Sequence, residues 1–428
     1  MNDSLSDYPA SYYASAAQIP APRAPLAASI KADVTVIGGG FTGLSAALHL
    51  AEAGASVVLL EAQRFGFAAS GRNGGQIHSG FRKDQRELEN WLGETRARGL
   101  WRLSEDAKAL LRGLIAKHKI ACALADGVIL AAHSHRAARA LARDAEHLSA
   151  HYGYSLLRML SAAEVNRTIG TRVYWGGRID AGGGHLQPLA FALGLARAAE
   201  AAGARLHENS AVLSIAREGA GVVARLEGAN VSARHAILAA DAFTPALAPE
   251  LAPYLARVDS HIIATEPLPA EIRAGLLTND AAVADTRHVV DYYRLSPDRR
   301  LLFAGGEYIF GAPKNIAAFV RPYMLRVFPQ LKNVAITHAW GGTVGITRTR
   351  LPHFGILKDR ILFGYGYSGQ GVALAVLGGK LLAEKALGQS DGFNLLASVP
   401  AKRFPGGAAL RKPLVKAALL ALKLEDKF

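Results

Sequence analysis

Hydrophobic and polar residues repeat along the chain with two different periods, which predicts a mixture of strands and helices. Residues 33–37 and 57–60 are short, largely apolar runs on either side of an alanine-rich segment, and together they predict a strand, a helix and a second strand. From about 84 to 165 the apolar residues recur mostly at helical spacing. Within that stretch Ser161 and Glu164 stand at the spacing of a capping box, which predicts the start of a helix.

The second half of the chain carries more strand signals. A helical pattern stops at Gly203, and residues 235–240 form an apolar run typical of a buried strand. Between about 252 and 335 short apolar runs alternate with polar turns, and one of them predicts a strand–turn–strand unit with Pro297 and Asp298 at its tip. A last strand pattern and a last helix pattern follow. Strand–helix units therefore occur at the start, in the middle and near the end of the chain.

The composition fits a packed protein and excludes several classes of function. Half of the 428 residues are hydrophobic and a fifth are charged, as in globular proteins. The net charge of +14 suits a nucleic-acid partner, but the basic residues are scattered without an aromatic-interleaved stripe, so we expect an anionic small ligand instead. Cys122 is the single cysteine; this excludes a disulfide framework and a cysteine-rich metal site, and its apolar neighbours predict a buried thiol.

No targeting or membrane-spanning pattern stands out. The N-terminus lacks the charged and apolar regions of a signal peptide, and no uninterrupted apolar run reaches membrane-spanning length. We therefore expect a cytoplasmic protein, either a monomer or a homodimer. The basic amphipathic tail, residues 410–428, predicts a helix whose leucines dock on the protein body, with a membrane surface as the alternative. His147 and His151 are expected on a solvated helix face, and no metal site is expected.

Three glycines give the first chemical signal. Gly38, Gly40 and Gly43 form G-x-G-x-x-G directly after the first predicted strand and at the start of the first helix. Such glycines permit a sharp turn, close approach of the backbone to a pyrophosphate, and tight packing of helix on sheet. Glu61 ends the next strand, where its carboxylate can accept hydrogen bonds from a ribose 2′-OH. In this context the pattern predicts a dinucleotide.

A second glycine-containing turn favours FAD over NAD. Residues 364–371 form this turn near the end of the chain, directly before the last predicted helix. FAD is long, and its ring reaches far from the pyrophosphate. The positive end of a helix that starts at this turn can stabilise the negative charge that reduction places on the ring.

Six segments of the chain share a further pattern: residues 36–54, 59–76, 183–196, 290–295, 350–355 and 366–372. Together they resemble the amine-oxidising FAD enzymes of the D-amino-acid oxidase and glycine oxidase group. The similarity extends over nearly the whole chain, and Gln370 stands where the group's pattern has a histidine. The resemblance implies an α/β fold, in which a Rossmann-like FAD-binding domain is interleaved with an α+β substrate domain that has a large antiparallel sheet.

The two domains are expected to be discontinuous in the sequence. We expect an N-terminal arm at 1–32, the FAD-binding domain at 33–105, 166–250 and 336–392, the substrate domain at 106–165 and 251–335, and a tail at 393–428.

The resemblance also implies which residues bind the cofactor. Non-covalent FAD is expected, because no histidine lies within residues 69–76 and Cys122 lies in another region; His78, just after that segment, is the alternative attachment point. The expected FAD-binding residues are Gly38, Gly40, Phe41, Thr42, Gly43, Glu61, Ala62, Ser70, Gly71, Arg72, Asn73, Gly74, Gly75, Gln76, Val212, Gly366, Ser368, Gly369, Gln370, Gly371 and Val372.

Four residues are candidates for contact with the substrate. Tyr292 and Arg294 alternate with Tyr293 on a predicted strand, so they share one face; there a phenol can close an apolar slot around an amine and the guanidinium can bind a substrate carboxylate. The alternative is plain sheet packing with a solvated arginine. His185 is expected either to line the pocket or to have a structural role in the core or a turn. Arg350 is a candidate for contact with the cofactor or the substrate, and the alternative is that it has neither contact.

The implied reaction is oxidation of a C–N bond by hydride transfer to flavin N5. The imine product hydrolyses to an aldehyde, with O2 as the acceptor and H2O2 as the second product. A gamma-glutamylated putrescine or a similar polyamine derivative is the leading substrate class. Two alternatives stay open: oxidation or dehydrogenation of a small amino acid such as glycine, sarcosine or proline, and a non-catalytic flavin-binding protein associated with membranes.

Overall fold

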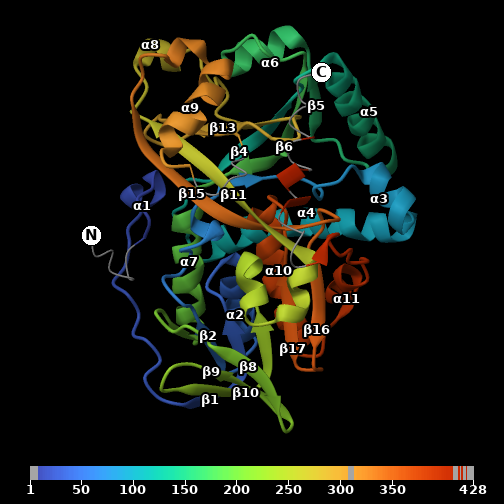
Figure 1. Ribbon diagram of the computed structural model, residues 1–428. Coiled ribbons are helices and arrows are strands. Elements are labelled where there is room, and N and C mark those ends of the chain that lie inside the picture. Colours follow the sequence, from blue (N-terminus) through green and yellow to red (C-terminus); the bar gives the residue numbers. More distant parts are fainter. Residues whose placement is uncertain (1–7, 307–312, 408–412, 415, 418–420, 422–428) are drawn as a thin grey trace.

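The chain forms two sheets, each with helices on it, one above the other in Figure 1. The structure is a computed structural model, and it describes residues 8–306, 313–407, 413–414, 416–417 and 421. The amphipathic helix expected at 410–428 falls mostly outside the described residues. Within the described part of the chain, no helix is long and apolar enough to cross a membrane.

The first sheet has eight strands, and its central strands are parallel and buried. Five of them follow one another in the order β17, β10, β1, β2, β7, all parallel, while β16 pairs antiparallel with β17 at one edge and the β8–β9 hairpin extends β10. The strands are β1 (Ile30–Ile37), β2 (Val57–Leu60), β7 (Arg205–His207), β8 (Ser214–Glu218), β9 (Gly221–Arg225), β10 (Asn230–Leu238), β16 (His353–Leu357) and β17 (Ile361–Tyr365).

Alanine- and leucine-rich helices cover one face of this sheet (Figure 1). The small side chains let the helices pack closely: a Cβ on Gly379 of α10 would lie 2.2 Å from the Thr42 carbonyl oxygen of α2. The helices of this layer are α2 (Phe41–Glu52), α4 (Glu94–Lys117), α7 (Pro188–Ala201) and α10 (Gly371–Ala386), with α3 (Gln85–Leu92) and α11 (Asp391–Ala397) beside them.

The second sheet has nine strands and is mostly antiparallel. Its order is β15-β11-β14-β13-β12-β4-β6-β3, and β5 pairs with β6. On one face Val320 and Met324 of α9 belong to the same buried cluster as Tyr293 and Phe303 of the sheet. The strands are β3 (Gln76–Ile77), β4 (Ala125–Ala131), β5 (Leu157–Leu160), β6 (Gly177–His185), β11 (Leu255–Thr265), β12 (Ala282–Asp285), β13 (Tyr292–Leu295), β14 (Leu301–Ala304) and β15 (Ile336–Thr347).

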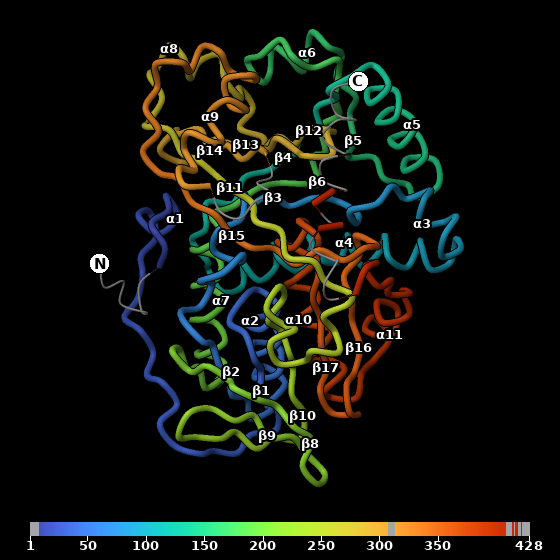
Figure 2. Tube along the Cα trace, viewed as in Figure 1, coloured from blue at the N-terminus to red at the C-terminus, as the bar shows by residue number. Residues whose placement is uncertain are grey.

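The remaining α-helices lie around the second sheet, and short segments connect the layers (Figure 2). The N-terminal arm, residues 8–29, passes along one side of both layers before it enters β1. The helices are α1 (Tyr12–Ala16), α5 (His135–Tyr152), α6 (Ala162–Ile169), α8 (Ala270–Arg273) and α9 (Ile316–Val327), and the short 3-10 helices are η1 (Ala69–Gly71), η2 (Asp241–Ala246), η3 (Pro249–Tyr254) and η4 (Pro329–Leu331).

Most elements predicted from the residue pattern are present. The strand–helix–strand unit is β1, α2 and β2, and Gly203, with φ +101°, follows α7. β13 and β14 form the predicted hairpin, with Pro297 and Asp298 in its turn. The capping box of α6 is complete: the Glu164 amide donates to the Ser161 hydroxyl oxygen, and the Glu164 carboxylate accepts from the Ser161 amide.

Sheet membership differs from the expected boundaries for three strands. β3, β6 and β15 lie in segments assigned to the FAD-binding domain, residues 33–105, 166–250 and 336–392, yet all three belong to the second sheet. β5, within the stretch predicted as mostly helical, pairs with β6 at the edge of that sheet. Their pairing is decided by strands distant in the sequence, which local periodicity does not reveal.

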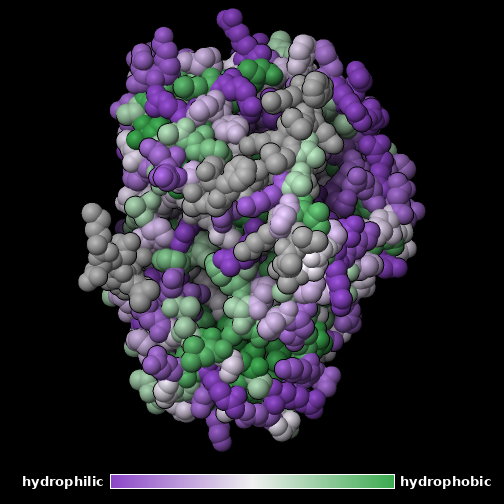
Figure 3. Space-filling view, viewed as in Figure 1, coloured by the Kyte–Doolittle hydropathy of each residue, from purple (hydrophilic) through white to green (hydrophobic). Residues whose placement is uncertain are grey.

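The surface of the molecule carries both hydrophilic and apolar side chains. In the face shown in Figure 3, hydrophilic side chains are spread over all parts of the surface and do not form a stripe, while an apolar area lies over the lower part, where the first sheet is. Cys122 is buried, and desolvation raises the pKa of its thiol to about 11, so the thiol is held neutral.

The capping box offers a test of local stability. Ser161→Ala removes the hydroxyl that accepts from the Glu164 amide, and we expect it to lower the free energy of unfolding by about 1 kcal/mol. The measurement is thermal or urea unfolding followed by circular dichroism. Ser149→Ala, on the exposed side of α5, is the control and should leave stability within error of the parent. Equal effects of the two substitutions would contradict the capping role.

Candidate functional site

The carboxyl ends of three neighbouring parallel strands place the glycine turns at one edge of the first sheet. β1 ends at Ile37, β10 at Leu238 and β17 at Tyr365, and β10 lies between the other two. Gly38 and Gly366 follow directly on the outer two strands. Ligands of open parallel sheets bind outside the carboxyl ends of the strands. The two turns, more than 300 residues apart in the sequence, are thus brought to the edge where a nucleotide is expected.

The first turn is fixed by contacts between backbone atoms. Gly38 has φ +109°, and a Cβ there would lie 2.6 Å from the Ala239 carbonyl oxygen. A Cβ on Gly43 would lie 1.8 Å from the Gly38 carbonyl oxygen. Because backbone cannot give way as a flexible side chain can, only glycine fits at either position.

The start of α2 approaches the segment that contains Ser70. Gly40 is the N-cap residue, and a Cβ there would lie 2.8 Å from the Ser70 hydroxyl oxygen. That hydroxyl accepts from the Phe41 amide at 3.0 Å. Phe41 and Thr42 are themselves buried, and the Thr42 and Tyr367 hydroxyls lie 2.8 Å apart, which joins the first turn to the second.

Glu61 supports the first turn from the neighbouring strand. Its carboxylate accepts from the Gly39 amide at 2.6 Å and from the Gln63 amide at 2.9 Å. Burial raises the pKa of this carboxyl group, and the two amides oppose that shift. The Glu61 carbonyl oxygen accepts from Ser210, two residues before the half-buried Val212, so the expected ribose and adenine contacts lie at the same end of the sheet.

Residues 69–76 form a compact loop between the two sheets. The Asn73 side-chain amide donates to the Ala69 and Ser70 carbonyl oxygens, and its oxygen accepts from the Gly75 amide at 2.7 Å. Arg72 donates to the Phe67 carbonyl oxygen at 2.6 Å and to the Gly341 carbonyl oxygen of β15 at 3.2 Å. Burial lowers the pKa of the Arg72 guanidinium. The loop is therefore tied to the long strand of the second sheet.

Asp241 organises the second turn, and the sequence analysis did not single it out. Its carboxylate follows β10 and accepts from the Gly366 amide at 2.8 Å and the Gly345 amide at 2.9 Å. Burial raises its pKa, while both amides stabilise the ionised form. The signal was available: a lone acid directly after a buried parallel strand stands where such sheets bind ligands.

Positive φ angles shape the rest of this turn. Gly366, Ser368 and Gly369 have φ values of +77°, +54° and +91°. Ser368 donates to the Gly366 carbonyl oxygen, and its hydroxyl oxygen accepts from the Thr347 amide at 3.2 Å. Gln370 is the N-cap residue of α10 without a side-chain capping bond, so the first amides of α10, at Gly371 and Val372, lie at a helix end suited to an anion.

The face of the second sheet near this loop carries Tyr292. A Cβ on Gly74 would lie 2.6 Å from the Tyr292 ring, and the Tyr292 hydroxyl lies 3.0 Å from the Ser260 hydroxyl. Arg294 also lies against this loop, whereas Tyr293 contacts Tyr174 and stacks on Phe303 in the opposite core. The predicted alternation along this strand is confirmed.

Arg294 does not have the expected geometry for binding a substrate carboxylate. It is 3% exposed, and it donates to the carbonyl oxygens of Gly74 at 2.8 Å, Leu186 at 2.9 Å and Leu295 at 3.2 Å. Its guanidinium also contacts the Tyr13 hydroxyl. The alternative of a solvated arginine is wrong, because carbonyl groups around the loop use its donors. The contact of Arg294 with a substrate carboxylate stays a prediction, and these bonds count against it.

His185 and Arg350 lie in two different places. His185 is buried on β6, and its Nε2 donates to the Asp280 carbonyl oxygen at 2.7 Å. Burial and the Arg294 charge lower its pKa to about 4, so the ring is neutral near pH 7. Arg350 follows β15 with φ +63°, in the segment that leads to β16.

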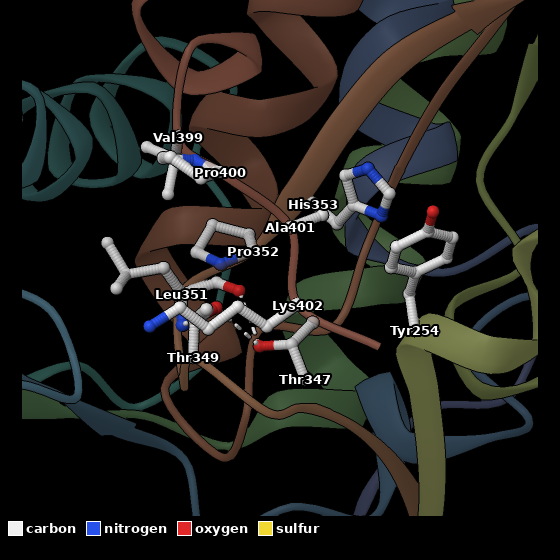
Figure 4. A pocket seen from close by; sticks show the side chains of 10 residues that line it. All are labelled: Tyr254, Thr347, Thr349, Leu351, Pro352, His353, Val399, Pro400, Ala401 and Lys402. Carbon is white, nitrogen blue, oxygen red and sulfur yellow. Dashed lines mark hydrogen bonds between the residues drawn. The ribbon is translucent and has the colours of Figure 1, made fainter. Parts of the chain in front are cut away.

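A small cavity lies beside the end of β15 (Figure 4). About 10 Å³ is open to the centre of a water-sized sphere, enough for about one water molecule. The cavity is therefore too small for an amine substrate. Its lining residues are Tyr254, Thr347, Thr349, Leu351, Pro352, His353, Val399, Pro400, Ala401 and Lys402.

The site fits a dinucleotide, and metal ligands do not gather in the described residues. Two glycine turns, two helix starts and the Glu61 carboxylate lie at one sheet edge, as an extended diphosphate ligand requires. Within the parts of the chain that the structure describes, no group of three or more His, Cys, Asp or Glu side chains could hold a metal ion. His147 instead lies 2.8 Å from a Glu89 carboxylate oxygen and stacks on His151.

Comparisons with known proteins agree with this geometry. The family described as "FAD dependent oxidoreductase" matches residues 33–385. The chain is 37% identical to gamma-glutamylputrescine oxidoreductase of Escherichia coli strain K12 over 99% of both chains. It is 39% identical to the probable oxidoreductase OrdL of Rhizobium meliloti strain 1021, over 94% of this chain and 93% of that relative. The crystal structure of glycine oxidase from Geobacillus kaustophilus has the same fold, with a TM-score of 0.74 and 21% identity, over 88% of this chain and 100% of that one.

The tight first turn predicts a large effect of one methyl group. Gly43→Ala forces a Cβ against the Gly38 carbonyl oxygen, so we expect a loss of about 1–3 kcal/mol in stability and purified protein that retains little FAD. Visible absorbance and thermal unfolding measure the two effects. Gly113→Ala is the matched control, because a Cβ there meets no atom within 4 Å and alanine favours the α4 helix. Full FAD occupancy in the Gly43 variant would refute the steric argument.

The buried His185 predicts a pH effect on stability. The pKa of His185 is about 4 in the folded chain and near 6.5 in the unfolded chain. Between these pH values mainly the unfolded chain takes up the proton, so the free energy of unfolding decreases as the pH is lowered. The decrease in the free energy of unfolding from pH 7 to pH 5 should be about 2 kcal/mol smaller in His185→Gln than in the parent. Urea unfolding at both pH values checks it. An unchanged slope for His185→Gln contradicts the assignment.

Proposed function

Because the chain belongs to the FAD-dependent oxidoreductase family, we propose that it oxidises a C–N bond of a gamma-glutamylated polyamine, with gamma-glutamylputrescine as the leading candidate. The imine product then hydrolyses to an aldehyde. Molecular oxygen is the proposed electron acceptor, with H2O2 as the second product. The support for the substrate is the similarity, over nearly the full length, to a relative named for that compound.

The residues at the sheet edge have proposed roles toward the cofactor. When bound, FAD supplies flavin N5 as acceptor for the hydride on the carbon next to the amine nitrogen. The Gly38–Gly43 turn and the start of α2 would hold the diphosphate, and Glu61 and Val212 would face ribose and adenine. The turn around Gly369 and the start of α10 would face the ring.

Tyr292 and Ser260 are proposed to orient the substrate. Their hydroxyls lie 3.0 Å apart on the sheet face that packs on the loop at Gly74. A neutral amine needs no strong base, only a dry position against the acceptor and a hydrogen-bond partner. The neutral His185, bonded to a backbone carbonyl, fits a supporting role in the wall of the site rather than proton transfer.

The observation that favours an amine over a small amino acid is the burial of Arg294. Amino acids carry a carboxylate on the carbon that reacts, and a carboxylate in a dry site needs a cation close to it. On this strand the guanidinium is already bonded to three carbonyl oxygens. The reacting end of the substrate is therefore proposed to lack a carboxylate.

Anaerobic titration tests the substrate. Gamma-glutamylputrescine should bleach the flavin absorbance at a rate at least about tenfold above putrescine, glycine, sarcosine and proline, and admission of air should restore the colour with H2O2 formed. Faster bleaching by an amino acid than by gamma-glutamylputrescine would favour a small amino acid as the substrate. A flavin that no amine reduces would favour the non-catalytic alternative, and bleaching without recovery in air would indicate a dehydrogenase.

Non-covalent attachment of FAD is tested by precipitating the protein with acid. The yellow colour should remain in the supernatant. Colour in the pellet would indicate a covalent bond, with His78 as the first residue to substitute, because Cys122 is buried as a neutral thiol.

Removal of one hydroxyl tests the proposed orientation of the substrate. Tyr292→Phe keeps the ring that packs on Gly74 but loses the contact with Ser260, so we expect kcat/KM to fall about tenfold while FAD stays bound. Steady-state kinetics and the flavin spectrum measure both effects. Tyr152→Phe removes a hydroxyl bonded to Glu89 on the outer helices and serves as the control. A Tyr292 variant with unchanged kinetics would remove this residue from the proposed mechanism.

A further inference from the structure

The N-terminal arm carries a buried aromatic side chain that lies behind the loop at residues 69–76. Tyr13 is in α1, which begins after Ser11, whose hydroxyl accepts from the Ala14 amide at 3.1 Å. Tyr13 is fully buried, although α1 is only five residues long. A helix this short has little stability of its own, so its burial depends on the contacts around it.

Tyr13 contacts two side chains that both hold this loop. Its hydroxyl accepts from Arg294 at 3.3 Å, and its ring meets the Trp340 ring edge-on, with centroids 5.1 Å apart. Arg294 donates to the Gly74 carbonyl oxygen at 2.8 Å, and the Trp340 indole N–H donates to the Arg72 carbonyl oxygen at 3.0 Å. Two carbonyl groups of the loop are thus fixed by residues that both rest on Tyr13.

The arm is anchored on both domains, which keeps Tyr13 in place. On the first, the Tyr8 hydroxyl donates to the Phe65 carbonyl oxygen at 2.7 Å, and the Arg23 amide donates to the buried Glu208 at 2.8 Å. On the second, the Tyr12 hydroxyl donates to Asp298 at 2.6 Å. The Tyr13 carbonyl oxygen also accepts from the Gln187 side chain at 2.9 Å.

We propose that Tyr13 is a positioning residue, which sets the loop at residues 69–76 against the flavin through Arg294 and Trp340. The proposal rests on the proposed role of that loop in binding FAD. Arg72 and Gly74 sit on either side of Asn73, so a shift of either carbonyl group changes the path of the whole loop. A side chain of the arm, about 60 residues before the loop in the sequence, thereby controls the cofactor environment without touching the cofactor.

Two substitutions separate the hydroxyl from the ring. Tyr13→Phe removes the bond to Arg294 and keeps the contact with Trp340, whereas Tyr13→Leu removes both. In the full-length enzyme we expect the dissociation constant for FAD to rise about tenfold in the leucine variant and less in the phenylalanine variant. The flavin absorption maxima and the flavin midpoint potential should shift in the same order. Tyr152→Phe, which removes a tyrosine hydroxyl bonded to Glu89 on the outer helices, is the control and should change none of the three.

A variant of the neighbouring side chain keeps the proposal testable if the leucine variant does not fold. Trp340→Phe removes the indole bond to the Arg72 carbonyl oxygen and keeps a smaller aromatic ring beside Tyr13, and it should raise the FAD dissociation constant and shift the spectrum in the same direction. Combined with Tyr13→Phe, its effect should be less than additive, because both act on one loop.

The outcomes distinguish positioning from a purely structural role. Variants of Tyr13 and Trp340 that unfold at lower temperature but keep the parent dissociation constant, spectrum and potential would overturn the proposal. A parent protein that binds no FAD would overturn the proposed function, and with it the positioning role of Tyr13. Altered flavin properties in the Tyr13 and Trp340 variants, with the Tyr152 control unchanged, would establish the positioning role.

Discussion

The contact between Gly43 and the Gly38 carbonyl oxygen is the constraint on which the site depends. No side chain fits between helix α2 and the end of β1, so the helix can start close to the sheet edge. That closeness brings the amides of the first helical turn to the carboxyl ends of β1, β10 and β17. The second glycine turn reaches the same edge because β17 is parallel to β10, and Asp241 joins it to β15. A small number of backbone contacts thus assemble a site from three distant parts of the chain.

Much of the charge near this site serves the protein backbone. Arg294 and Arg72 donate to carbonyl oxygens of the surrounding loops, and Glu61 and Asp241 accept from amide groups. A buried loop has polar backbone groups that need partners, and long ionised side chains provide them. The loop at residues 69–76 is thus held by hydrogen bonds within itself and to the second sheet. This arrangement suits a reaction in which the cofactor carries out the chemistry and the protein orients a neutral amine.

The second sheet and the arm add stiffness from the opposite side. β15 and β11 are paired along their whole length, and Trp340 and Ser260 lie on the face directed toward the loop. Tyr292 packs on Gly74 from that face, and Tyr13 supports Arg294 and Trp340 from behind. The contacts of this wall therefore come from segments near residues 13, 74, 260, 292 and 340. Only a folded chain brings such segments together, so the wall and the cofactor loop depend on each other.

The sequence by itself determined the local elements and the cofactor class. The first strand, helix and strand, the glycine turn with Glu61, the capping box at Ser161 and the alternation at Tyr292 follow from spacing and backbone chemistry within a few residues of one another. Only the tertiary structure decided that Arg294 is bonded to carbonyl groups, that Asp241 joins two loops, and that β6 and β15 belong to the second sheet. The physical reason is that many of these partners are distant in the sequence: Arg294 donates to Gly74, 220 residues away, and Asp241 accepts from Gly345, 104 residues away. Periodicity in the sequence carries no information about which distant groups will meet.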